Sequence, residues 1–117
     1  MATRVLIVDD HADFRRLARL ILTQSGFEVV GEAEDAASAR LAAQELTPDA
    51  VLLDVQLPDG DGIDIAEELR DRAEVVLIST RDAGTYGHRL TESSARGFVN
   101  KRDLTGEAVA ALLSKPA

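Results

Sequence analysis

The chain alternates short apolar runs with helical patterns, and this alternation constrains the fold more than any other feature of the sequence. Five short, mostly apolar runs have the length of strands, and they lie at residues 5–8, 27–30, 50–53, 75–78 and 97–99. The run at 5–8 is continuous in β-branched and aliphatic residues, as expected for a strand buried on both faces. A segment with helical character follows each run. The sequence therefore predicts a (βα)₅ chain of the α/β class, with a parallel sheet covered by helices on both faces.

The helical segments between the runs differ in how clearly they are marked. The first has apolar residues at i, i+3, i+4 and i+7, which predicts one buried face made of Phe14, Leu17, Ala18 and Ile21. Asp35 and Thr105 are candidate N-caps for the second and the last helix. Residues 82–94 are marked least, because Gly84 and Gly87 flank indifferent helix formers, and we expect a short or mobile helix there.

Length and composition limit the class of protein. A chain of 117 residues has room for one domain, which we expect to span residues 1–117. The absence of cysteine excludes disulfides and thiolate metal sites, and a net charge of −8 argues against a nucleic-acid surface. The apolar run near the start is too short for a signal peptide or a membrane span. We therefore expect a soluble, cytoplasmic protein that contacts neither nucleic acid nor membrane directly.

Polar side chains gather where four of the predicted strands end. In an open parallel sheet, ligands bind beyond the carboxyl ends of the strands, next to the point where the strand order reverses. The residues at or just after these ends are Asp9, Asp10, Asp54, Ser79, Thr80 and Lys101. If the first and third strands are neighbours, three carboxylates converge and repel one another unless a cation lies between them. Ligands that are all oxygen suit Mg²⁺ or Mn²⁺.

Four segments of the chain resemble the signature segments of response-regulator receiver domains in two-component signalling. They are VLIVDDH, LLDVQLPDGDG, VVLIST and ARGFVNK, and the resemblance covers essentially the whole chain. The 44 residues from Asp10 to Asp54 and the 22 from Ser79 to Lys101 are spacings typical of the family. The resemblance implies a single doubly wound, flavodoxin-like domain with strand order 2-1-3-4-5. The chain is similar to chemotaxis regulators and to the receiver domains of regulators with a DNA-binding output domain.

The resemblance also implies a role for each residue of the acidic cluster. Asp54 resembles the aspartate that accepts a phosphoryl group from a sensor histidine kinase or a phosphotransfer protein. Asp10 and Asp54 resemble direct Mg²⁺ ligands, Asp9 a ligand through water, and the backbone carbonyl of Gln56 a further ligand. Lys101 resembles the lysine that contacts a phosphoryl oxygen. Such a domain is a signalling phosphoacceptor, and it is an enzyme only in assisting its own phosphorylation and slow dephosphorylation.

A second group of residues resembles the conformational switch of the family. Ser79 aligns with the switch hydroxyl that bonds the phosphoryl group, and Thr80 is an adjacent candidate. Phe98, three residues before Lys101, aligns with the switch aromatic. The switch is expected to control an output domain or a downstream protein, and a homodimer that forms on phosphorylation is a further possibility.

Simpler explanations exist for each residue taken alone. One carboxylate of the Asp9-Asp10 pair could cap the helix that contains Phe14, and Lys101 could be a solvated lysine at a strand end. Ser79 and Thr80 could satisfy backbone groups where the strand stops, and Phe98 could be part of the core. His11 and His88 are read as surface residues. The loop aspartates Asp59 and Asp61 are read as ordinary turn residues.

Two other functions compete with the receiver interpretation. An aspartate-nucleophile phosphatase also uses aspartate and Mg²⁺ on an α/β sheet, but it needs a D-x-D motif after the first strand, where this chain has Asp9-Asp10-His11. A pseudo-receiver binds its partners without phosphorylation, and it would not need the full set of site residues that this chain retains.

Overall fold

Five parallel strands form the sheet of the computed structural model, which describes residues 2–114. The strands are β1 (Arg4–Val8), β2 (Glu28–Ala33), β3 (Ala50–Asp54), β6 (Glu74–Ser79) and β7 (Gly97–Asn100). Their order in the sheet is β2-β1-β3-β6-β7. Because β6 and β7 are the fourth and fifth strands of this sheet, the predicted order 2-1-3-4-5 is confirmed. Residues 1 and 115–117 of the predicted domain lie outside the described part.

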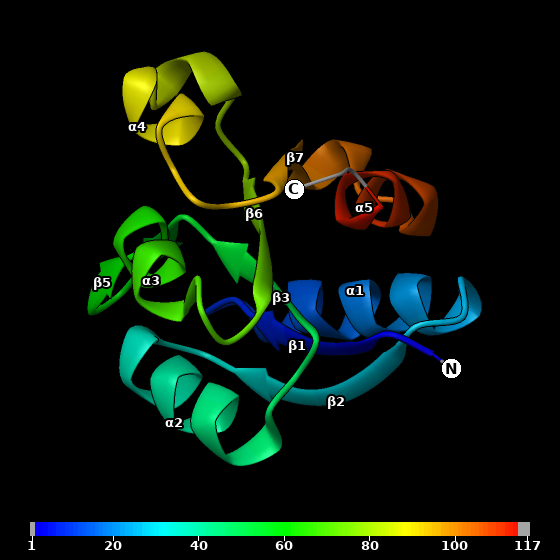
Figure 1. The fold of residues 1–117 in the computed structure, drawn as a ribbon. Coiled ribbons are helices and arrows are strands. Elements are labelled where there is room, and N and C mark those ends of the chain that lie inside the picture. The colour runs from blue at the N-terminus through cyan, green and yellow to red at the C-terminus, as the bar shows by residue number, and fades with distance from the viewer. Residues whose placement is uncertain (1, 115–117) are drawn as a thin grey trace.

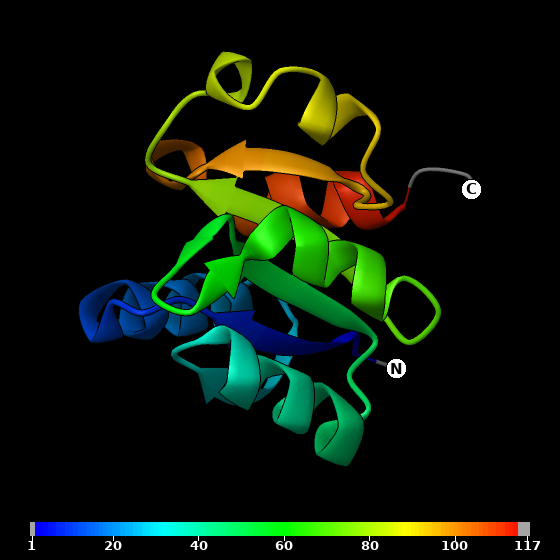
Figure 2. The ribbon, with the colours of Figure 1, turned by 90° about the vertical axis from the view of Figure 1, so that its left-hand side faces the viewer.

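Helices cover both faces of the sheet (Figure 1). One face carries α1 (Ala12–Gln24) and α5 (Gly106–Leu113). The other carries α2 (Ala36–Leu46), α3 (Gly62–Leu69) and the short α4 (His88–Thr91), and Figure 2 shows α2 and α3 lying across the strands on this side.

The core is aliphatic, as the composition predicts. Successive side chains of a strand point to opposite faces of a sheet. On β1, Val5 and Ile7 therefore pack toward α1 and α5, whereas Leu6 and Val8 pack toward α2 and α3. All four are buried, so β1 is covered on both sides and its continuous apolar run is explained.

The first helix differs from the prediction at one position. Its buried residues are Ala18 and Leu22, with Phe14 and Ile21 partly buried beside them. Leu17 is 50% exposed, so its predicted place in the core is wrong. It lies one residue, about 100° of rotation, from Ala18, and this places it at the edge of the buried stripe.

The caps predicted for α2 and α5 are present. Asp35 accepts a hydrogen bond from the backbone N–H of Ser38, and Thr105 accepts one from Ala108. Residues 82–94 form only a 3₁₀ turn (Ala83–Thr85) and the four-residue α4, which confirms the predicted short helix.

The loop between β3 and α3 is more ordered than expected. It folds back as a hairpin of β4 (Gln56–Leu57) and β5 (Gly60–Asp61). The carboxylate of Asp59 accepts hydrogen bonds from the first backbone N–H groups of α2, at Ala36 and Ala37, and these bonds hold the pKa of Asp59 below its usual range. Asp61 caps α3 through Ile63. Both aspartates therefore tie the hairpin to helices, beyond the turn role expected of them.

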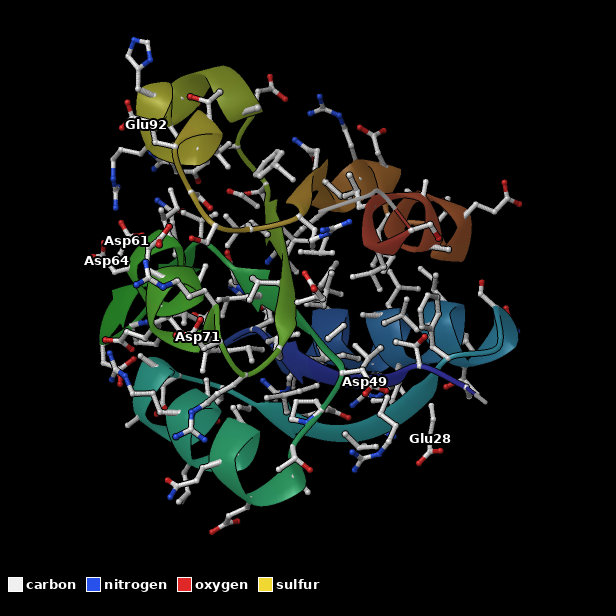
Figure 3. All side chains as sticks on the ribbon, in the orientation of Figure 1. Glu28, Asp49, Asp61, Asp64, Asp71 and Glu92 are labelled. Atoms are coloured by element: carbon white, nitrogen blue, oxygen red, sulfur yellow. The ribbon has the colours of Figure 1, made fainter. Side chains whose placement is uncertain are left out.

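The acidic surplus is spread over the surface. The side chains labelled in Figure 3 come from different elements and point outward, and they include Glu28 on β2 and Glu92 after α4. Within residues 2–114, no helix is both long enough and apolar enough to cross a membrane.

Candidate functional site

The order of the strands brings the acidic residues together. β1 and β3 are neighbours, and Val8 is opposite Leu53 in their register. Asp9, which follows β1, therefore lies beside Asp54, which ends β3. Carboxylate oxygens of Asp9, Asp10 and Asp54 lie within 4.8 Å of one another. Asp9 and Asp54 are buried, whereas Asp10 is exposed.

Lys101 reaches into this cluster from the end of β7. Its Nζ lies 2.5 Å from Oδ2 of Asp9 and 3.1 Å from Oδ2 of Asp54. The ammonium also lies 4.6 Å from the ring centroid of Phe14, and the side chain is only 10% exposed. This burial and pairing exclude the interpretation of Lys101 as a solvated lysine.

The cluster carries more negative than positive charge. Three carboxylates face the one ammonium of Lys101, which leaves two negative charges uncompensated by it. Burial raises the pKa of Asp54, and the hydrogen bond from the Gln56 N–H and the charge of Lys101 offset part of that rise. Burial alone would lower the pKa of Lys101, but its contacts with Asp9 and Asp54 outweigh burial and raise it. The lysine therefore stays protonated, and the site retains an affinity for further positive charge.

The donor atoms fit a hard divalent cation. The buried Oδ2 of Asp9 makes no well-aligned hydrogen bond with the described residues, so its compensation comes from the Lys101 ion pair alone. A cleft of about 270 Å³ opens beside the carboxylates, and its polar lining consists of Asp10, His11, Asp54, Gln56, Thr80 and Lys101. Carboxylate and carbonyl oxygens around such a cleft suit Mg²⁺ or Mn²⁺.

Neither carboxylate of the Asp9-Asp10 pair caps α1. His11 occupies the N-cap position, and no side chain bonds the first turn there. Oδ1 of Asp9 accepts the backbone N–H of His11 instead, before the helix begins. The His11 ring is exposed as predicted, yet its Nδ1 lies 3.2 Å from Asp9 and 3.1 Å from Asp10. The capping interpretation is therefore wrong.

The two hydroxyl candidates occupy different environments. Thr80 is exposed and lines the cleft. Ser79 is 1% exposed, and its Oγ accepts the backbone N–H of Arg81 at 3.0 Å. The same Oγ lies 2.6 Å from the hydroxyl of Tyr86. Only Thr80 faces the cleft in this conformation, whereas Ser79 is engaged with the segment that leads to α4.

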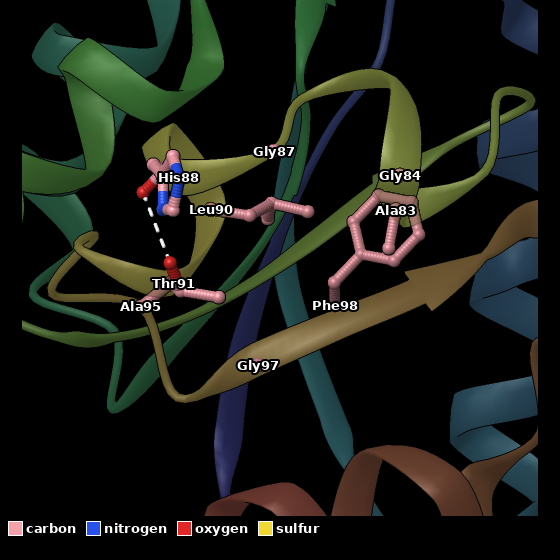
Figure 4. A pocket seen from close by; sticks show the side chains of 9 residues that line it. All are labelled: Ala83, Gly84, Gly87, His88, Leu90, Thr91, Ala95, Gly97 and Phe98. Carbon is pink, nitrogen blue, oxygen red and sulfur yellow. Dashed lines mark hydrogen bonds between the residues drawn. The ribbon is translucent and has the colours of Figure 1, made fainter.

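Phe98 lies on β7, opposite Leu77 of β6 in their register. Its ring is partly buried, and its centroid is 6.1 Å from that of Tyr86 at an angle of 56°. Figure 4 shows the ring beside Ala83 and Gly84, at the border of a cavity between β7 and α4. Phe98 is therefore neither fully packed core nor free at the surface.

Several residues that shape the site were not predicted from the sequence. Asn100 is buried, and its Nδ2 donates to the carbonyls of Thr80 and Arg81 and to Asp82, so it holds the end of β6 in place. A polar residue directly before Lys101 at a strand end was a signal that could have identified it. Oδ1 of Asn100 also accepts the backbone N–H of Arg102. A proline at position 102 would lack this donor.

Two further residues support the acidic cluster through the backbone. Arg15 donates from its guanidinium to the carbonyl oxygen of Asp9 at 2.6 Å. Gly62, the first residue of α3, packs so tightly that a Cβ there would lie 2.2 Å from the carbonyl oxygen of Asp54. The glycines of the PDGDG segment hinted at such a close approach, whereas nothing in the sequence marked Arg15.

Comparison with known proteins identifies the family. The sequence family model of the response regulator receiver domain matches residues 5–112 of this chain. The chain is 36% identical over 104 residues to the chemotaxis protein CheY of Bacillus subtilis, and the match covers 86% of this chain and 87% of CheY. The signal receiver domain of NarL from Mycobacterium tuberculosis has 30% sequence identity and a TM-score of 0.85, with 97% of this chain and 98% of that one covered.

A longer relative is a transcriptional activator. The chain is 30% identical over 110 residues to the DNA-binding transcriptional activator EvgA of Escherichia coli, and the match covers 92% of this chain. It spans only 54% of the length of EvgA, about half of that protein. The receiver signature at the strand ends, the five-stranded sheet and these matches agree, and the chain belongs to the family of response regulator receiver domains of two-component systems.

Proposed function

We propose that residues 1–117 act as one receiver domain that accepts a phosphoryl group on Asp54, in a reaction that depends on Mg²⁺ or Mn²⁺. The donor is a phosphohistidine of a sensor kinase or a phosphotransfer protein. The observation that carries this proposal is the position of the Asp54 carboxylate, which lines an acidic cleft and lies 3.1 Å from the ammonium of Lys101. The reaction takes place in the cytoplasm.

The chemistry is a transfer between two nucleophiles. A carboxylate oxygen of Asp54 attacks phosphorus, the P–N bond to histidine breaks, and an acyl phosphate forms. Oδ1 of Asp54 already accepts the N–H of Gln56, which orients the carboxylate. Lys101 contacts Oδ2 in the resting state and is placed to pair with a phosphoryl oxygen once that oxygen arrives.

A bound cation would offset the charge that accumulates at the transferred group. Asp10, Asp54 and the backbone carbonyl of Gln56 would hold it directly, and Asp9 would do so through water. The oxygen-only donor set and the surplus of carboxylates over ammonium groups support this assignment.

The output is a shift in conformation. The Ser79 hydroxyl, or in second place that of Thr80, bonds the phosphoryl group, and Phe98 changes its rotamer. This alters the surface around α4, β7 and α5, which then acts on an output domain or a downstream protein and can pair two copies of the domain. Similarity to CheY and to EvgA supports an output of either kind. The net charge of −8 argues against direct contact of this domain with nucleic acid.

The kinase is expected to dock on α1, next to the acidic cleft. Leu17 and Leu20 are 50% and 56% exposed on this helix, with Arg16 and Arg19 beside them. An exposed apolar stripe with charged margins is typical of a surface that binds another protein.

Beryllofluoride with Mg²⁺ tests the proposal, because it mimics an acyl phosphate on aspartate. The wild-type domain is expected to show changes in amide NMR shifts at the strand ends, and Asp54→Asn is expected to abolish both these changes and labelling by a small phosphodonor such as acetyl phosphate. Asp71→Asn is the control. Asp71 is an exposed carboxylate that does not line the cleft, so this variant should behave as wild type.

Three results would contradict the proposal. Phosphate incorporation by Asp54→Asn at the wild-type rate would place the acceptor elsewhere. Multiple turnover of a small phosphoester would favour the aspartate-nucleophile phosphatase, and a wild-type domain that binds no beryllofluoride would favour the pseudo-receiver.

A further inference from the structure

The resting domain engages Ser79 through a residue outside the switch pair of Ser79 and Phe98. Tyr86, the only tyrosine of the chain, follows the 3₁₀ turn after β6 and places its hydroxyl 2.6 Å from Oγ of Ser79. We propose that Tyr86 is a positioning residue that holds the Ser79 hydroxyl out of the acidic cleft and releases it when a phosphoryl group forms on Asp54. This inference rests on the proposed function of Asp54.

The geometry makes the two contacts of Ser79 mutually exclusive. Ser79 is 1% exposed, and Thr80 rather than Ser79 lines the cleft. For Oγ to reach a group on Asp54, the side chain must turn, and a turn moves Oγ away from the hydroxyl of Tyr86, whichever of the two atoms donates the proton. Tyr86 therefore competes with the phosphoryl group for the same hydroxyl.

Tyr86 also connects Ser79 to Phe98. The two aromatic rings are in tilted contact, with centroids 6.1 Å apart. Phe98 borders a cavity of about 530 Å³ that Leu90, Ala95 and the backbone of Gly84 also line (Figure 4). A side chain in a close-packed core cannot change rotamer without strain, but a ring beside a cavity has room to move. A movement of Tyr86 on loss of its bond to Ser79 can therefore change the rotamer of Phe98 directly.

The segment that carries Tyr86 is anchored by Asn100 at its start, at Arg81 and Asp82, and has few polar attachments after that. Residues 81–85 and 87–89 are exposed, and the 3₁₀ turn buries no residue. Arg89 pairs with Asp61 at 2.9 Å, but this ion pair is half exposed and contributes little. Beyond the anchor that Asn100 provides at Arg81 and Asp82, the Tyr86–Ser79 hydrogen bond is therefore a main polar link between residues 83–89 and the sheet, and breaking it frees this stretch to rearrange.

Tyr86→Phe tests the inference, because it removes the hydroxyl and keeps the ring against Phe98. The resting state loses one hydrogen bond that the beryllofluoride-bound state does not make. The variant is therefore expected to bind beryllofluoride and Mg²⁺ about 2- to 10-fold more tightly than wild type in an NMR titration. Thr91→Val is the matched control. It removes a hydroxyl that bonds only the carbonyl of His88, so wild-type affinity is expected.

A second pair of variants separates this role from general loosening of the segment. In a Ser79→Ala background, Tyr86→Phe is expected to leave the affinity unchanged, because the bond it would remove is already absent. A gain in affinity in that background as large as in the wild-type background would overturn the inference, and so would equal affinities of Tyr86→Phe and wild type. Urea unfolding of each variant verifies that it folds.

Tyrosine emission gives an independent measurement. The chain has no tryptophan, so its intrinsic fluorescence comes from Tyr86 alone. Beryllofluoride is expected to change this emission in wild type and not in Asp54→Asn. Unchanged emission despite Asp54-dependent binding would contradict the role of Tyr86 and leave the phosphoacceptor intact, whereas absence of any binding would contradict the proposed function itself.

Discussion

At the scale of single residues, the acidic cluster depends on one lysine. The Nζ of Lys101 touches the carboxylates of Asp9 and Asp54, and all three side chains are at most 10% exposed. Two buried carboxylates at neighbouring strand ends would repel each other without it. The lysine therefore stabilises the resting fold in addition to its proposed contact with the phosphoryl group.

Lys101→Met is expected to lower the free energy of unfolding by about 3 kcal/mol in the absence of divalent cations, because it leaves the buried charge of Asp9 unpaired. Methionine keeps the apolar contact with Phe14. Added Mg²⁺ is expected to restore part of the loss, since it supplies positive charge to the same oxygens. Urea unfolding with and without Mg²⁺ measures both effects.

Arg102→Met is the control for this experiment. Arg102 is the next residue, but its side chain is 65% exposed and pairs only with exposed carboxylates. A change of at most about 1 kcal/mol is expected. If the two variants lost equal stability, the buried position of Lys101 would have no special effect.

The sequence predicted the acidic residues and Lys101 because strand ends in a parallel sheet lie at one edge, whatever the details of the loops. It could not predict the Tyr86–Ser79 bond. That contact depends on the path of an irregular turn that begins after β6, and no periodic pattern specifies such a path. The spacing to Lys101 favoured Ser79 over Thr80, but it contained no sign that Ser79 would be bonded away from the cleft.

At the scale of elements, α3 is placed against the backbone of the site. Gly62 begins the helix, its N–H donates to the carbonyl of Val55 at 2.7 Å, and its Cα faces the carbonyl of Asp54. The position of Asp54 therefore depends on how closely α3 approaches β3. Only glycine permits this close approach, since any side chain at position 62 would collide with backbone atoms of Asp54 and Val55.

Gly62→Ala is expected to reduce stability by about 1–3 kcal/mol and to weaken beryllofluoride binding, because the added methyl must displace the backbone at Asp54. Gly84→Ala is the matched control, since nothing lies within 4 Å of a Cβ there. It should bind beryllofluoride as wild type does. Urea unfolding and NMR titration measure the two effects, and an equal outcome for both glycines would show that the contact at Asp54 has no consequence.

The elements themselves were largely predictable from the sequence. The inner strands β1, β3 and β6 are covered on both faces and leave continuous apolar runs, which are a strong signal, whereas the edge strand β2 is only partly buried. The signal for α1 was ambiguous, because Leu17 fits the helical spacing although only the stripe through Ala18 and Leu22 is buried. The β4–β5 hairpin was missed because its strands have two residues each, and the contact of Asp59 with α2 joins residues 22 and 23 positions apart.

At the scale of the whole molecule, the topology of the sheet determines where buried negative charge is concentrated. The chain carries a net charge of −8, most of it spread over the surface, and only the edge of the sheet concentrates buried carboxylates. Sequence patterns predicted the alternation of strands and helices. The strand order came from the resemblance to a family, because apolar runs do not specify which strands are neighbours.

Mg²⁺ is expected to stabilise the folded domain as a whole, because only the folded chain brings the site carboxylates together. A ligand present at 100 times its dissociation constant contributes about 2.7 kcal/mol. The thermal midpoint should therefore rise with Mg²⁺ in wild type and rise less in Asp54→Asn. NaCl at equal ionic strength is the control for screening of the net charge, and an equal rise with both salts would argue against a specific site.

The ion pair of Lys101 with Asp9 and Asp54 has a consequence for the life of the protein in a cell. Because Lys101 already pairs with both buried carboxylates, the domain is expected to fold without a metal, although a bound cation would stabilise it further. Under the proposed function, a shortage of magnesium is then expected to stop phosphorylation without unfolding the domain. On the same proposal, the folded domain would then persist unphosphorylated until both the cation and the phosphodonor are present.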